Sequence, residues 1–202
     1  MPRQIGRGLP ALLAVLIIQG VARAASASVH EKLAVLTFEP AKTTISYKLV
    51  GWPHVSSGTF KLKTGMIRVD PATGEMAGLI VVDAASGSSG HRIRDARMKR
   101  DILEVQRFPD ITFAPQKVGS SGHPPGAFPV LVRGILTLHG RPHSVTITAT
   151  VERQGKLVTI RCGFTIPYVA WGLEDPSILF FAVAKVVTVR ISAVANLSWR
   201  SS

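Results

Sequence analysis

Apolar and polar residues alternate with a period of two along most of the chain. The clearest cases are ISYKL at 45–49, VTITATV at 145–151, IRCGFTI at 160–166 and VTVRISA at 187–193. Successive side chains of a β-strand point to opposite faces, so each segment predicts a strand with one apolar face. Cys162 falls on such a face, where a small thiol is more often a packing residue than a nucleophile.

Other apolar segments extend the pattern and predict strands at 33–38, 58–62, 66–69, 78–84, 111–118 and 130–138. Turn-forming residues separate them: Asp70–Gly74 and His139–Pro142 predict sharp reversals, and 120–129 predicts a Gly/Pro-rich loop. The apolar run 178–197 contains charged residues and is β-branched in its second half, which predicts a turn and a final strand rather than a membrane span. The order is that of an antiparallel meander.

One segment, 88–108 (SSGHRIRDARMKRDILEVQRF), lacks the two-residue alternation and predicts a short helical excursion. Ser88 or Ser89 can cap its first turn, and Asp101 followed by Glu104 has the form of a capping box that begins a second short helix. An antiparallel sheet with one such excursion is best closed as a barrel, because closure removes exposed edges. The predicted fold class is therefore all-β.

Composition agrees with a single β domain. The chain has 202 residues, 46% of them hydrophobic, with 18 Gly, 13 Pro and only 6% aromatic residues, which favours many turns over long helices. A single cysteine excludes an intramolecular disulfide, a CxxC redox pair and a thiolate-based zinc site.

The N-terminal segment has the three parts of an export signal. Arg3 and Arg7 supply positive charge, and Ala11–Ala22 is an apolar stretch too short for a usual membrane span. Small residues then predict cleavage after Ala24, with Ala27 as the second choice. An uncleaved anchor is the alternative.

Cleavage defines a signal peptide at 1–24 and a mature domain at 25–202, and lowers the formal net charge from +12 to +9. We expect the mature protein to be periplasmic or secreted, where a basic surface meets anionic lipid headgroups and envelope polymers rather than nucleic acid. A surface charge that only keeps the protein soluble is the alternative.

No catalytic or metal-binding constellation is found. His139 and His143 lie on opposite sides of a predicted turn, and Glu174 and Asp175 are neighbours in a predicted loop. The glycine- and serine-rich loops do not form a Gly-x-Ser-x-Gly elbow. The sequence therefore predicts a protein that is not an enzyme and has no metal or catalytic residue.

Four motifs in a fixed order carry a family resemblance: Gly58-Thr59-Phe60, Arg94-Asp95, FPDITF at 108–113 and GILTLHG at 134–140. In this order they resemble the YceI-like family, over about Val35 to Ala195. The resemblance implies a lipocalin-like eight-stranded antiparallel β-barrel in the periplasm, with a long isoprenoid lipid such as a quinone or polyprenyl chain in its bore. It implies no other cofactor. Dimers occur in the family, so a homodimer is left open.

The residues support such a site independently, since an eight-stranded barrel can hold one slender ligand. Candidates for the bore or its rim are Val50, Trp52, Phe60, Ile67, Val82, Phe108, Phe113, Ile135, Phe164, Trp171 and Phe181. The polar candidates at the opening are His54, His91, Arg94 and Asp95. For each apolar residue the alternative is ordinary core, and for Arg94 and Asp95 it is an ion pair or cap at the helix start.

Two functions follow as hypotheses. The first is an exported carrier that sequesters an isoprenoid lipid and collects it at a membrane. The second is a membrane- or envelope-binding module with a self-filled barrel, acting through the basic cluster Arg92, Arg94, Arg97, Lys99, Arg100 and Arg107.

Overall fold

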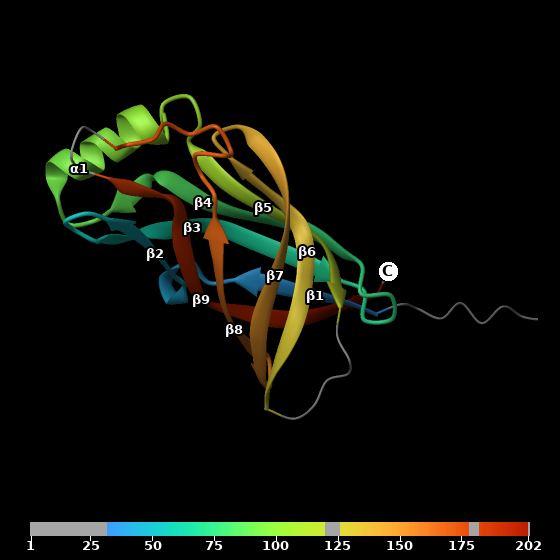
Figure 1. Ribbon diagram of the computed structural model, residues 1–202. Helices are drawn as coiled ribbons and strands as arrows, with labels where there is room; N and C mark the ends of the chain where they lie inside the picture. The colour runs from blue at the N-terminus through green and yellow to red at the C-terminus, as the bar shows by residue number, and fades with distance from the viewer. Residues whose placement is uncertain (1–31, 120–125, 178–181, 202) are drawn as a thin grey trace, which may run out of the picture.

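The computed structural model describes residues 32–119, 126–177 and 182–201. Within them the chain forms nine strands, two single-turn helical segments and a short α-helix (Figure 1). The predicted signal peptide and Phe181 lie outside the described residues. The elements are β1 Lys32–Phe38, η1 Pro40–Lys42, β2 Thr44–Gly51, β3 Ser56–Val69, β4 Met76–Ser88, α1 Arg92–Arg97, η2 Met98–Ile102, β5 Asp110–Gly119, β6 Ala127–Leu138, β7 Arg141–Gln154, β8 Leu157–Ile166 and β9 Val183–Ser201.

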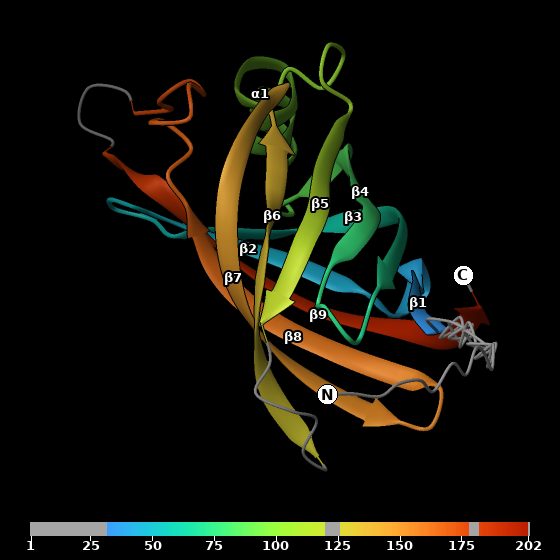
Figure 2. The same ribbon diagram turned by 90° about the vertical axis from the view of Figure 1, so that its right-hand side faces the viewer.

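The sheet closes on itself. Its hydrogen-bonded order is β3-β2-β9-β8-β7-β6-β5-β4, and β4 pairs back onto β3, with every pairing antiparallel. This confirms the predicted eight-stranded barrel. In Figure 2, β5, β6 and β7 run upright while β2, β3 and β9 run across the view, as the strong coiling of a small closed barrel requires.

β1 and β2 occupy the same position in the barrel, between β3 and β9, one after the other. β1 pairs with the Met66–Val69 end of β3 and with the far end of β9, whereas β2 pairs with the Ser56–Phe60 end of β3 and with the first half of β9. The η1 turn separates the two. The predicted strands 58–62 and 66–69 are thus one long strand, because β3 must reach past both partners.

The predicted reversals are confirmed. In the β3–β4 turn the Ala72 N–H donates to Asp70 Oδ1 at 2.8 Å, and Gly74 has a φ of 75°. In the β6–β7 hairpin His139 and Gly140 have φ values of 53° and 69°, the left-handed pair that matches strand twist in a two-residue hairpin. The predicted loop at 120–129 is shorter than expected, since β6 already begins at Ala127.

The helical excursion is confirmed, but its predicted caps are wrong. α1 continues directly into η2, a single turn of π-helix. Ser89 does not cap the helix; its N–H donates instead to Asp95 Oδ1 at 2.8 Å. Asp101 cannot begin a second helix because it lies inside η2, paired with Arg100, and Glu104 follows with a φ of 44°. Within the described ranges no helix is long and apolar enough to cross a membrane.

Substitution of Gly58 tests how closely β3 packs against β2 and β4. A Cβ at this position would lie 2.1 Å from the Ser88 carbonyl oxygen and 2.7 Å from the Tyr47 ring. We expect Gly58→Ala to lower the free energy of unfolding by about 3 kcal/mol, measured by urea denaturation followed by circular dichroism.

The matched control is Gly163→Ala in β8, where the nearest atoms to a new Cβ are 3.7 Å away. That variant should stay within about 0.5 kcal/mol of the parent. Equal effects of the two substitutions would contradict the β2–β3–β4 packing.

Candidate functional site

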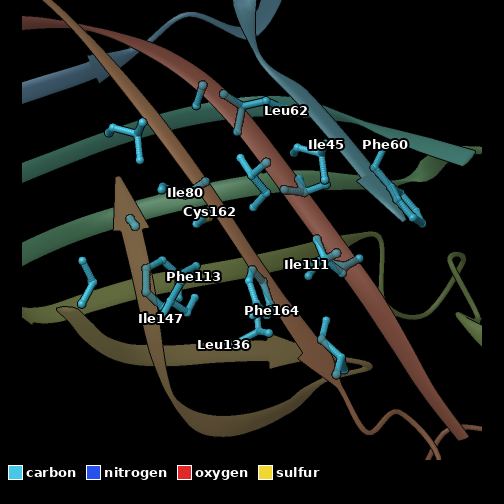
Figure 3. A pocket seen from close by; sticks show the side chains of 18 of the residues that line it. Ile45, Phe60, Leu62, Ile80, Ile111, Phe113, Leu136, Ile147, Cys162 and Phe164 are labelled. Carbon is cyan, nitrogen blue, oxygen red and sulfur yellow. The ribbon is translucent and has the colours of Figure 1, made fainter. Parts of the chain in front are cut away.

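A cavity of about 1230 Å³ runs through the barrel. Its wall is made by alternate residues of the strands, as the two-residue period predicts. Figure 3 shows these side chains converging on one interior space from seven strands, with Ile45 from β2, Phe60 and Leu62 from β3, Ile80 from β4, Ile111 and Phe113 from β5, Leu136 from β6, Ile147 from β7, and Cys162 and Phe164 from β8. A cavity of this size contradicts the hypothesis of a self-filled barrel.

The buried core is divided into two clusters, so the barrel is packed locally rather than throughout its bore. One cluster joins the β1 region to β3 and β9, with Phe38, Leu62 and Ala195 among its buried members. The other lies beside the helical excursion and includes Leu103 and Leu138. Residues of both clusters also line the cavity, which is therefore bounded by well-packed groups.

The helical excursion covers one end of the barrel (Figure 1). Met98, Ile102 and Leu103 reach the cavity from it. Gly87 in β4 permits this contact, because a Cβ there would lie 2.6 Å from the Phe60 ring and 2.7 Å from the Met98 methyl group. The sequence signal for this contact is a glycine whose role only the packing reveals.

Two histidines fix the segments around this end. His139 Nε2 in the β6–β7 turn lies 2.7 Å from Glu104 Oε1, just beyond η2, and its ring contacts Phe108 with centroids 4.4 Å apart. His143 stacks on Trp171 at 3.9 Å with an interplanar angle of 4°. These contacts hold the chain after η2 and the turn after β8 against the barrel.

Polar residues that line the cavity at this end include Tyr47, His54, Arg94 and Arg97, while Asp70, Thr73 and Arg153 line it at the opposite end. Arg94 is oriented by Ser89: its Nε donates to Ser89 Oγ at 2.8 Å and its Nη2 to the Ser89 carbonyl at 3.3 Å. Burial raises the pKa of Tyr47, so this phenol stays protonated near neutral pH. Hydrogen-bond donors, two of them guanidinium groups, therefore face the α1 end of a largely apolar cavity, which also has polar residues at its other end.

The structure brings eight of the predicted site residues to the cavity: Trp52, His54, Phe60, Ile67, Val82, Arg94, Phe113 and Phe164. They come from β3, β4, α1, β5 and β8 and from the β2–β3 connection. Their placement agrees with a site in the bore. Whether they contact a ligand stays a prediction.

The other described candidates do not line the cavity. Val50 and Ile135 fall on the outward parity of their strands, since their neighbours Leu49 and Leu136 point inward. Phe108 and Trp171 instead pack on the two anchoring histidines described above.

The last two belong to the start of the helix. His91 directly precedes α1, and Asp95 accepts hydrogen bonds from the Ser89 N–H and hydroxyl and from the Ser88 hydroxyl. The pKa of Asp95 is lowered, chiefly by the Ser89 hydroxyl bond. Asp95 therefore makes a structural contact at the start of the helix, which is the role considered above as the alternative to headgroup binding.

Sequence reasoning missed residues that reach the cavity from turns and helices. Arg97 and Met98 lie one turn beyond Arg94, at the helical spacing that shares a face. Tyr168 follows β8, and its hydroxyl donates to the Ala184 carbonyl at 2.9 Å. At the opposite end Trp199 and the β3–β4 turn also border the cavity. Helical spacing could have found Arg97, whereas the turns carry no such signal.

Within the described residues, no group of three or more His, Cys, Asp or Glu side chains is placed to hold a metal ion. Cys162 is partly buried in the cavity wall, and burial raises its pKa to about 11. A thiol in this state is a poor nucleophile at neutral pH.

A model of the YceI-like domain matches residues 36–195. The chain belongs to this family. A curated relative, a UPF0312 protein of Pseudomonas putida strain F1, is 37% identical over 102 residues, which are 49% of this YceI-like chain and 50% of the relative. A UPF0312 protein of Pseudomonas fluorescens strain SBW25 is 35% identical over 109 residues, 53% and 54% of the two chains. The matches thus span about half the length of these relatives.

Two solved structures share the YceI-like fold. BcnA of Burkholderia cenocepacia superposes with a TM-score of 0.65 at 22% identity, covering 79% of this chain and 99% of BcnA. A polyisoprenoid binding domain from Saccharophagus degradans, implicated in plant cell wall breakdown, has a TM-score of 0.62 at 15% identity, with coverages of 81% and 98%. At these identities the likeness shows the fold.

Cys162 offers a chemical test of the cavity wall in the YceI-like barrel. Because its pKa is raised to about 11, the thiolate fraction at pH 8 is far below that of a free thiol. We expect a thiol-disulfide reagent to label the native protein at least about 100-fold more slowly than the urea-unfolded chain. The native rate should keep rising with pH beyond 9, where an exposed thiol levels off.

The control is Thr150→Cys in a Cys162→Ser background, since Thr150 is exposed on the outer face of β7. That thiol should react at the rate of the unfolded chain. Native labelling of Cys162 at the control's rate would contradict its placement in the wall.

Proposed function

We propose that this YceI-like protein binds a long isoprenoid lipid inside the barrel and sequesters or carries it outside the cytoplasm. The observation that carries the proposal is the largely apolar cavity of about 1230 Å³, which Arg94 and Arg97 border at the α1 end. Family membership supports it, as does the polyisoprenoid-binding neighbour with the same fold.

The chemistry of the wall suits a hydrocarbon tail. Each CH₂ group removed from water contributes roughly 0.8 kcal/mol, so one five-carbon isoprene unit contributes roughly 3 kcal/mol before the cost of ordering it. Methyl groups provide this without directional contacts, which fits a repetitive tail. A headgroup needs hydrogen-bond partners, and His54, Arg94 and Arg97 supply donors at one end.

The proposed role is binding without covalent chemistry. Cys162 is protonated at neutral pH because burial raises its pKa to about 11. His139 is engaged by Glu104, and His143 by the Trp171 ring. A quinone or a polyprenyl chain fits the cavity equally well in chemical terms, and homodimerization stays a prediction.

Export is tested by the mature N-terminus. We expect the protein recovered from the periplasm or medium to have lost residues 1–24, through the small-residue site that ends at Ala24. Intact-mass spectrometry distinguishes cleavage after Ala24 from cleavage after Ala27. A full-length mass in the membrane fraction would favour an uncleaved anchor.

Lipid binding is tested by organic extraction of protein purified without detergent. We expect about one isoprenoid lipid per barrel by mass spectrometry. Ala149→Phe should lower this occupancy at least about tenfold, because Ala149 is a small residue of the wall and a phenyl group there fills the bore.

The matched control is Thr150→Phe, the next residue of β7, which faces outward. It should retain the parent's lipid content. Thermal unfolding of both variants establishes that they are folded. The proposal fails if the parent carries no stoichiometric lipid and takes up neither added quinone nor added polyprenyl alcohol.

A further inference from the structure

Exposed apolar side chains gather at the α1 end of the barrel. Among the described residues, ten large apolar side chains are exposed, and five of them belong to the end of β2, the β2–β3 connection, α1 and the start of β9, which Figure 1 places at this end. We call them the mouth patch: Val50, Trp52, Val55, Ile93 and Val186. Trp52 is 70% exposed and Ile93 is 78% exposed. The barrel core does not require these exposed side chains, because the residues next to them in the strands point inward and form the wall.

Backbone pairing brings the strand members of the mouth patch together. β2 and β9 are paired at Leu49 with Val187 and at Gly51 with Val183, with a register shift between, so Val50 lies beside the irregular part of β9 that contains Val186. The Trp52 N–H donates to the Ala182 carbonyl at 2.8 Å. The β2–β3 connection and the start of β9 are therefore one joined rim.

The cavity reaches the α1 end between this rim and the helix, and we refer to this end as its opening; its other end reaches the β3–β4 turn. Trp52 and His54 line it from the rim, and Arg94 and Arg97 line it from the helix. Figure 1 shows α1, the β2–β3 connection and the start of β9 at the same end of the barrel, away from the C-terminus. Ile93 adjoins the lining residue Arg94 on α1. Apolar side chains thus stand on both sides of the opening.

The charge around the opening is positive. The helical segment 92–102 has five basic residues and two acidic ones, and 48–57 has Lys48 and no acidic residue. The segment 173–177 adds Glu174 and Asp175, of which Asp175 pairs with Lys185 of β9, so the balance stays positive. Both acids of the helical segment are already engaged, Asp95 by Ser89 and Asp101 by Arg100. Exposed apolar groups within a basic rim match a bilayer surface that offers acyl chains beneath anionic headgroups.

We propose that the mouth patch docks on an anionic lipid bilayer and sets the cavity opening against the membrane. The proposal rests on the proposed lipid-binding function and names the surface through which the lipid is exchanged. Trp52 and Ile93 enter the interface from opposite sides of the opening, while Arg92 and Lys99 contact headgroups. A lipid tail then passes from bilayer to cavity without crossing water.

Vesicle co-sedimentation tests docking directly. The probes are vesicles of equal parts phosphatidylglycerol and phosphatidylcholine, and vesicles of phosphatidylcholine alone. We expect binding to the first, at least about tenfold weaker binding to the second, and a steep loss as salt is raised. Equal binding to both vesicle types would overturn the proposal.

Variants that leave the cavity wall untouched locate the surface. Val55 and Ile93 are absent from the lining, so the pair Val55→Ser and Ile93→Ser should weaken binding about tenfold or more. Arg92→Gln with Lys99→Gln should do so by a similar factor and flatten the salt dependence. The controls are Lys156→Gln in the β7–β8 turn and Leu157→Ser at the exposed first residue of β8, and both should bind as the parent does.

Orientation is read from tryptophan fluorescence with bromine-labelled lipids, which quench a buried indole. Trp52 at the opening and Trp199 at the other end are both exposed, which makes them a matched pair. We expect Trp52→Phe to remove most of the quenching and Trp199→Phe to leave it. The reverse result, or equal loss, would overturn the proposed orientation.

Two readouts separate this inference from lipid binding itself. A parent protein that holds isoprenoid lipid but does not bind vesicles would overturn docking and leave the carrier function standing. Vesicle binding through the mouth patch by a barrel that holds no isoprenoid lipid would support the surface and overturn the carrier function. Saturable binding to a purified protein partner, lost in the Val55 and Ile93 variant while vesicles fail to bind, would reassign the patch to that partner.

Discussion

One row of paired residues governs the interior of the barrel. Ala149 lies opposite Cys162, Cys162 opposite Ile191, Ile191 opposite Ile45, and Ile45 opposite Phe60, across five successive strands. All five line the cavity. Because side-chain direction follows backbone register, a slip of one residue in any of these strands would turn an apolar wall toward water. The register that closes the hydrogen-bonded sheet therefore also directs the apolar side chains into the bore.

The width of the space follows from which residues occupy that row. Ala149 and Cys162 stand side by side on β7 and β8 and project little volume, while the larger Phe60 faces the helix-covered end. The same parity leaves the outer row polar, with Thr150, Arg161 and Ser192 paired across β7, β8 and β9. A wall of this composition can contact a hydrocarbon along its length, because dispersion and burial need no fixed partner.

The two-residue alternation of apolar and polar positions was enough to predict the strand residues of the cavity wall. The wrong assignments of site residues have specific causes. Val50 and Ile135 were assigned to the site by residue type, although each sits one position from an inward residue. Aromatic character could not separate Phe113, which lines the cavity, from Phe108, which packs on His139. That distinction depends on a contact across 31 residues of sequence, which no local pattern contains.

The helical excursion shows the same limit in another form. Its existence follows from the loss of alternation between 88 and 108, but its cap does not follow from the capping-box pattern. Ser89, Arg94 and Asp95 form one hydrogen-bonded group in which the side chains of the helix hold the preceding chain. The polar pattern alone does not indicate which side chain bonds to the backbone at the helix start, since the serine and the aspartate are both able to cap.

Differences in backbone pairing bear on how the proposed lipid would enter. β6 and β7 are paired at twelve positions and β8 and β9 at ten, whereas β4 and β5 share four, beside the helical excursion that interrupts them. Parting the wall would leave backbone donors and acceptors unsatisfied, at a cost for each pair. An end lined by exposed side chains such as Trp52 imposes no such cost. For the proposed lipid, lengthwise entry at such an end avoids this cost, and the groups at that end would select the headgroup.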